Sequence, residues 1–189
     1  MKKFLPIVII LFIIGLVAYY YIAIANKDDE VKDSSFLTDN RLLELSETPS
    51  ELMNFINTVY ENPSQVIRTN NILRKMIYSG EYDEAERENL INMQRMLFDE
   101  ELLEINPKEF HYITIAAELE KWNEFKFKII GSEFLPPEYQ SEDIAIIKVV
   151  FYTNDPETDI YTQYALKRNG MGEWKILGWA SVPKFDIVK

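Results

Sequence analysis

Three regions follow one another along the chain, and they differ in how apolar and polar residues are distributed. Residues 4–25 carry no charged side chain, residues 26–47 are mostly polar, and residues 48–189 mix apolar and polar positions at regular spacings. As a helix, the uncharged stretch is about 33 Å long, enough to cross a hydrocarbon layer of about 30 Å. We therefore predict a transmembrane anchor in residues 1–25, a polar tether in 26–47 and one folded domain in 48–189.

The N-terminal segment also fits a cleaved signal peptide. Lys2 and Lys3 would be its charged start, and Ala23-Ile24-Ala25 resembles a cleavage site. The length of the apolar run and the bulky residues Tyr19–Tyr21 favour an uncleaved anchor. Whether the chain is cut after Ala25 stays open. Both interpretations export the domain, and the two lysines favour a cytoplasmic N-terminus, so we expect a single-pass protein of the cell membrane with an extracytoplasmic domain.

Helical periodicity dominates the first part of the folded domain. Apolar residues recur three and four positions apart, and capping residues or prolines separate the runs. The pattern predicts four helices, over residues 48–62, from about 64 to Ser79-Gly80, from about Asp83 to Asn106-Pro107, and from Lys108 to about Asn123.

From Phe125 onwards the apolar period shortens towards two, which is typical of strands. Short turn sequences separate the runs, so consecutive strands are expected to pair as an antiparallel meander. The predicted strands cover residues 125–129, 144–153, 160–168 and 174–182. Helices followed by strands predict an α+β domain in which three to four helices pack on a curved four-stranded antiparallel sheet.

This order of elements, closed by the strand WKILGW at residues 174–179, resembles the NTF2-like, cystatin-related cone fold over roughly residues 48–183. The whole chain is also similar to uncharacterised membrane-anchored proteins of Gram-positive, clostridial-type bacteria. The resemblance implies an exported NTF2-like domain and brings no known activity with it.

The folded part is strongly acidic. Lys2 and Lys3 are the only charged residues before residue 26, so residues 26–189 retain 18 of the 20 basic residues and all 31 acidic ones, a net charge of −13. Such a domain repels phosphate backbones and anionic headgroups. Nucleic acid is therefore not an expected partner.

Sequence signatures of catalysis and cofactor binding are missing. The chain has no Gly-rich nucleotide loop, no G-x-S-x-G motif and no cysteine, and its single histidine is His111. We therefore predict no metal site, no cofactor and no catalytic residues, and we favour a non-enzymatic protein. His111 leaves a general base or a pH-sensitive group open, against the alternative of a partly buried packing residue.

Aromatic residues on the last predicted helix and on the strands are candidates for ligand binding, because cones of this type often close an apolar pocket there. Their alternative role is core packing. Trp174 and Trp179 are five residues apart, so a regular strand would direct them to opposite faces and leave one for a partner to cover. The candidate ligand-binding residues are His111, Tyr112, Trp122, Tyr152, Tyr164, Trp174 and Trp179.

The leading hypothesis is a membrane-tethered, extracytoplasmic binding or scaffolding module, held in the membrane by residues 4–25 and associated with other envelope proteins. The alternative is a small-ligand carrier or enzyme that uses an apolar cone pocket, with His111 or Tyr112 as acid or base. A third possibility is an envelope spacer without a specific ligand. The surroundings of His111 separate these hypotheses, because a filled cone with His111 on the surface would exclude the enzyme.

Overall fold

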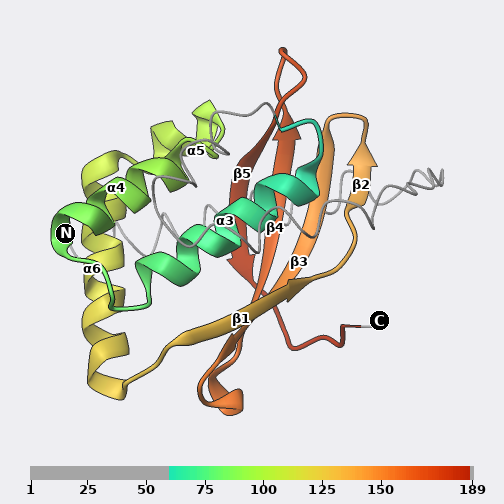
Figure 1. Cartoon of the computed structure of the whole chain (residues 1–189). Helices are drawn as coiled ribbons and strands as arrows, with labels where there is room; N and C mark the ends of the chain where they lie inside the picture. The colour runs from blue at the N-terminus through green and yellow to red at the C-terminus, as the bar shows by residue number, and fades with distance from the viewer. Residues whose placement is uncertain (1–59, 188–189) are drawn as a thin grey trace, which may run out of the picture. The chain divides into compact units, whose positions relative to one another are not determined.

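A computed structural model describes residues 60–187, in which helices pack against one face of an antiparallel sheet (Figure 1). The α+β prediction is confirmed. The predicted anchor, the tether and nearly all of the helix predicted over 48–62 lie outside the described residues. Between residues 60 and 187, no helix combines the length and the apolar character that a membrane crossing needs.

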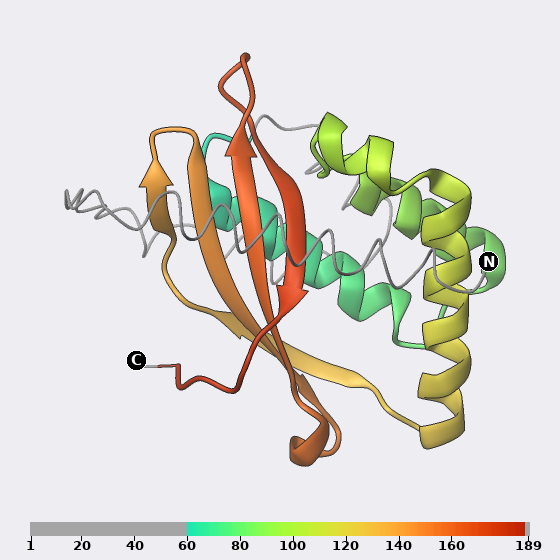
Figure 2. The ribbon, with the colours of Figure 1, turned by 180° about the vertical axis from the view of Figure 1, so that it is seen from behind.

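Helix α3 (Pro63–Ile77) crosses the face of the sheet, lying in front of it in Figure 1 and behind it in Figure 2. The Asn62 side chain caps its start by accepting a hydrogen bond from the Ser64 amide at 2.8 Å. Val66, Ile67 and Ile77 are fully buried on its apolar side. The second predicted helix is confirmed.

The third predicted helix is two helices, α4 (Glu84–Arg95) and α5 (Glu100–Ile105). Between them the backbone pairs with the sheet: the Ile176 amide donates to the Leu97 carbonyl and the Asp99 amide to the Ile176 carbonyl, both at 2.8 Å. Phe98 forms a parallel bridge with Ile176 and is 4 % exposed. The prediction of one continuous helix was wrong because this contact with a distant strand replaces a turn of helix.

Helix α6 (Lys108–Phe125) confirms the fourth predicted helix, but it ends later than predicted. Its end is fixed by Lys126, which has a left-handed conformation with φ of 55°. The predicted strand over 125–129 was therefore wrong: Phe125 is helical, and strand β1 (Ile129–Phe134) begins only at Ile129.

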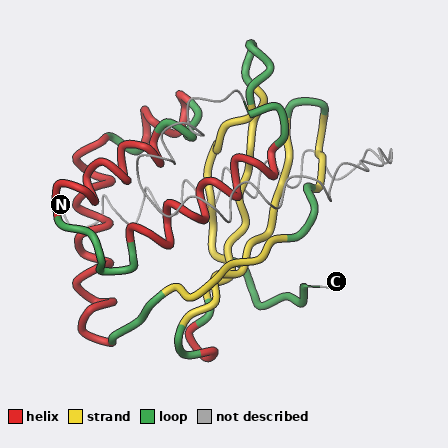
Figure 3. The backbone as a smooth tube through the Cα atoms, in the orientation of Figure 1, coloured by secondary structure: helices red, strands yellow, loops and turns green. Residues whose placement is uncertain are grey.

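The other strands are β2 (Glu138–Ser141), β3 (Ile144–Thr153), β4 (Ile160–Arg168) and β5 (Trp174–Ser181), shown in yellow in Figure 3. The order is β1-β3-β4-β5, and β2 pairs with the first residues of β3 on the edge that β1 occupies further along. A short 3-10 helix, η1 (Pro156–Thr158), joins β3 to β4. The three long predicted strands are confirmed, and β2 was not predicted.

A β-bulge in β5 changes the orientation of its aromatic residues. Ile176 pairs with Leu166 and Gly178 pairs with Ala165, so Leu177 is an extra residue between two registered pairs. Trp179 consequently lies opposite Tyr164, on the face that α3 covers, together with Trp174 and Ile176. The expectation that Trp174 and Trp179 face opposite sides was wrong, because it assumed a regular strand.

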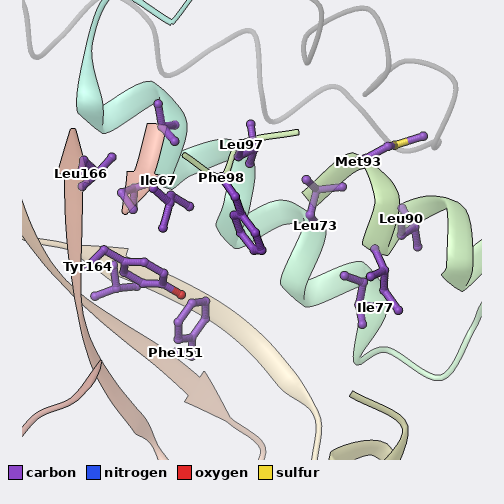
Figure 4. Packing of buried hydrophobic residues seen from close by; sticks show 14 of the residues in the cluster. Ile67, Leu73, Ile77, Leu90, Met93, Leu97, Phe98, Phe151, Tyr164 and Leu166 are labelled. Atoms are coloured by element: carbon purple, nitrogen blue, oxygen red, sulfur yellow. The ribbon is translucent and has the colours of Figure 1, made fainter. Parts of the chain in front are cut away.

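The hydrophobic core lies between the sheet and the helices. Figure 4 shows Ile67 and Leu73 of α3 on either side of Phe98 and Ile77 nearer to Leu90, with Tyr164 and Phe151 on the sheet side. These two sheet residues are 1 % and 0 % exposed and are the largest fully buried side chains in the described part of the chain. The core thus includes the apolar side of α3 and the inner faces of β3 and β4.

Candidate functional site

A cavity of about 280 Å³ lies beside this core, between α3, α4, α6 and the inner faces of β4 and β5. Trp179 and Tyr164 border it from the sheet, and Trp122 and Ile115 border it from α6. Glu118, which is exposed, lies at its rim. Apolar surfaces and several polar groups therefore share one partly open pocket.

Helix α3 supplies the polar side of the cavity through Asn70, Arg74 and Tyr78. These residues are four positions apart, so they form one stripe along the helix, next to the apolar stripe that packs on the sheet. Their placement follows from helix geometry once α3 is seated on β3 and β4.

Arg74 extends from this stripe towards the sheet. Its guanidinium carbon lies 5.0 Å from the centre of the Phe151 ring and 5.5 Å from that of Tyr78, within the range of cation–π attraction. Nη1 donates to the Tyr164 hydroxyl at 3.5 Å, and Nε is buried without a partner among residues 60–187. Burial lowers the pKa of Arg74, but Tyr164, Tyr78 and Glu118 raise it more, so the side chain stays positively charged.

Tyr78 separates Arg74 from the nearest carboxylate. Its hydroxyl donates a hydrogen bond to Oε2 of Glu118, and its ring packs on Trp122 with 4.7 Å between ring centres. Burial raises the pKa of Tyr78 above its usual value; Arg74 opposes that shift and Glu118 adds to it. The phenol is therefore a protonated donor at neutral pH.

His111 lies deeper in the cavity wall and is 5 % exposed. Its ring packs against Phe98, with 5.5 Å between centres, and Nδ1 has no hydrogen-bond partner in the described part of the chain. Burial, followed by the positive charges of Arg95 and Arg74, lowers the pKa of His111 to about 4. The imidazole is thus neutral at pH 7, with one nitrogen able to donate and the other able to accept.

A buried amide pair completes the polar side. Gln94 of α4 donates from Nε2 to Oδ1 of Asn70 at 2.9 Å, which leaves the Asn70 Nδ2 group without a partner within residues 60–187. Like Asn70 Nδ2, the atoms Arg74 Nε and His111 Nδ1 are buried without protein partners in the described part of the chain, and all three belong to residues that line the cavity. Leaving such groups unsatisfied costs about 1–3 kcal/mol each.

The structure brings four of the seven candidate residues to this cavity: His111, Trp122, Tyr164 and Trp179. Trp174 is buried beside Tyr139 at the other end of β5, with 6.0 Å between ring centres.

The two remaining candidates also lie elsewhere. The Tyr112 hydroxyl donates to the Glu88 carbonyl at 3.0 Å, on the side of α6 that faces α4. Tyr152 alternates with the buried Phe151 and Thr153, so it points to the opposite face of the sheet, where it donates to Glu133 at 2.9 Å.

Of the polar residues of the cavity, His111 and Tyr164 were predicted, and those contributed by α3 and α4, together with Glu118, were not. Asn70, Arg74 and Tyr78 show a signal in the sequence, since a polar stripe with a period of four follows an apolar helix face. Gln94 and Glu118 show none, because their roles depend on how α4 and α6 pack against α3. In the range 60–187, no group of His, Cys, Asp and Glu side chains is arranged to hold a metal ion.

Fold and cavity together define an α+β domain whose helices pack on one face of a curved antiparallel sheet and line a partly polar, partly open pocket beside the core. The chain belongs to a family described as a domain of unknown function (DUF6715), whose model matches residues 1–179. No curated protein matches the chain. No solved structure matches it either.

Proposed function

We propose that the protein is a membrane-tethered, extracytoplasmic binding module whose NTF2-like cone holds a small molecule. The observation that supports this function is the cavity at Arg74 and His111, with its three buried polar atoms that lack protein partners. A space filled only for packing would have no reason to retain a charged guanidinium and a neutral imidazole, because burying such groups costs stability.

Binding is favoured over catalysis by the state of His111. A general base works best with a pKa near the operating pH, whereas the pKa of His111 is about 4. No carboxylate among residues 60–187 is hydrogen-bonded to its ring to raise that value, and Glu118 instead accepts a hydrogen bond from Tyr78. The cavity offers recognition groups rather than an acid–base pair.

The membrane anchor is the part of the proposal that comes from the sequence. Residues 4–25 are uncharged and long enough to span a bilayer, and the family model includes them together with the domain. This supports a conserved pairing of the apolar segment with the domain rather than a fortuitous N-terminal extension. Carbonate-washed membranes should retain the full-length protein; intact protein in the soluble fraction would contradict the anchor.

A scaffolding role is the second candidate, and the outer side of α6 favours it. Phe110 and Ile113 are three residues apart, so they share one side of the helix, and they are 56 % and 68 % exposed. Neighbouring envelope proteins are the expected partners for such a surface. Crosslinking in intact membranes should recover a reproducible partner, and a Phe110→Ser/Ile113→Ser double variant should lose it.

Thermal denaturation in the presence of small organic compounds tests the binding function. A ligand at 100 times its Kd stabilises a protein by about 2.7 kcal/mol, which corresponds to an increase in Tm of roughly 5–10 °C for a domain of this size. The increase should disappear in Thr162→Leu, which fills the cavity, and persist in Tyr152→Phe on the opposite face. If no chemical class raises the Tm, the proposed function is wrong.

A further inference from the structure

Arg74 places a positive charge in the wall of the cavity, within a domain that is otherwise strongly acidic. No carboxylate among residues 60–187 lies within the 4.0 Å of an ion pair to Arg74, and Glu118, the carboxylate that acts on its charge, is exposed and accepts a hydrogen bond from the Tyr78 hydroxyl. His111 is uncharged at neutral pH because its pKa is about 4. The charge of Arg74 is therefore left without a full counter-charge.

The orientation of Arg74 is fixed by the rings on which it packs. Phe151 and Tyr78 both lie within 5.5 Å of its guanidinium carbon, and Tyr164 holds Nη1. Contacts with these rings constrain the plane of the guanidinium. A guanidinium held in one plane matches the two oxygens of a carboxylate in a bidentate pair.

The remaining polar groups also select for an acceptor. Asn70 Nδ2 and Arg74 Nε are donors only, and both lack partners within the described residues. His111 Nδ1 donates or accepts according to its tautomer. A ligand with acceptor oxygens can satisfy these two donors, and a second cation cannot.

The volume and the apolar wall residues of the cavity limit what the rest of the ligand can be. A volume of about 280 Å³ is at the small end of the range for ligand pockets. Trp179, Trp122 and Ile115 supply apolar surface opposite the polar stripe of α3. The space suits a carboxylate attached to one ring or a short aliphatic chain.

We propose that the cavity binds a small organic monocarboxylate, with its carboxylate on Arg74 and Asn70 and its apolar body against Trp179 and Trp122. This inference rests on the proposed binding function and adds the chemical class of the ligand. His111, which is neutral in the folded state, contributes a hydrogen bond to a carboxylate oxygen without adding charge.

The experiment measures binding to the full-length protein in detergent by titration calorimetry and thermal shift, with benzoate, hexanoate, benzamide, benzylamine and inorganic phosphate as probes. A carboxylate should bind at least tenfold more tightly than benzamide, and benzylamine should not bind. Arg74→Met should abolish this preference, and Arg74→Lys should weaken carboxylate binding roughly tenfold, because an ammonium cannot form the bidentate pair. Arg87→Met is the matched control: Arg87 also has a buried, unpartnered Nε but does not line the cavity.

Each other result identifies which idea fails. If benzamide binds as tightly as benzoate and Arg74→Met does not change this, the proposed binding function stands but the preference for a carboxylate is wrong. If phosphate binds and neither benzoate nor hexanoate does, the proposal of an organic monocarboxylate is wrong. A folded protein, shown by its cooperative melt, that binds none of these probes or any neutral compound would overturn the proposed function as well.

Discussion

Gln94 and Asn70 form a buried amide–amide hydrogen bond of 2.9 Å that joins α4 to α3 at the edge of the cavity. Their exposed fractions are 6 % and 1 %, so each amide depends on the other for a partner. Gln94→Leu should destabilise the domain by about 1–3 kcal/mol, because it leaves the Asn70 carbonyl oxygen buried and unpaired.

A double-mutant cycle tests this dependence. The pair Asn70→Leu/Gln94→Leu should cost less than the sum of the two single substitutions, by at least about 1 kcal/mol, since it removes both polar groups together. Urea denaturation of the four proteins gives the coupling energy. Purely additive costs would show that the two side chains do not depend on each other.

The stability of the domain should decrease as the pH falls from 7 to 5, and His111 should cause the decrease. Its pKa is about 4 in the folded state and 6.5 ordinarily, so unfolding takes up a proton in this range. The contribution is fully present above pH 6.5 and is lost as the pH approaches 4. With allowance for partial solvation, the change between pH 7 and 5 is about 1–2 kcal/mol.

Because His111 is the single histidine of the chain, the effect can be assigned. Charged groups that act on it are Arg95 on α4 and Arg74 on α3. In His111→Gln the free energy of unfolding should be nearly constant between pH 5 and 7. An equal slope in wild type and variant would show that the ring is solvated rather than buried.

Arg74→Met should destabilise the domain without ligand, by about 1–2 kcal/mol. Burial lowers the pKa of Arg74, but Tyr164, Tyr78 and Glu118 raise it more, so the fold favours the charged side chain. Methionine keeps part of the packing on Phe151 and Tyr78 but loses the hydrogen bond to Tyr164 and the cation–π contacts. Chemical denaturation of the ligand-free proteins checks the sign, and Arg74→Met more stable than wild type would mean that desolvation outweighs these contacts.

The fold could largely be predicted from the sequence wherever local interactions determine it. The ends of α3 depend on Asn62, Pro63 and Gly80, and the apolar alternation of β4 shows which side chains face the core. The break between α4 and α5 was not readable, because neither glycine nor proline marks it. It exists through the pairing of Phe98 with Ile176, nearly eighty positions away in the sequence.

The candidate site could be predicted only in part, for a similar reason. Large aromatic residues such as Trp122 and Tyr164 were expected at the junction of helix and sheet, where they do border the cavity. Arg74 was missed because a lone arginine in a helix is usually solvated. Only its position above Phe151 shows that this one is partly buried. The anchor over residues 4–25 stays a prediction.

The bulge at Leu177 gives a final prediction, since it decides which of two neighbouring residues faces inward. With the extra residue, Trp179 points into the domain, where its ring centre is 5.5 Å from that of Phe98, and Ala180 points to the opposite face. A regular strand would reverse the two. Trp179→Gln should therefore cost about 2–4 kcal/mol and Ala180→Gln less than about 1 kcal/mol. Urea denaturation of this matched pair measures both, and a larger cost for Ala180→Gln would place the bulge elsewhere or remove it.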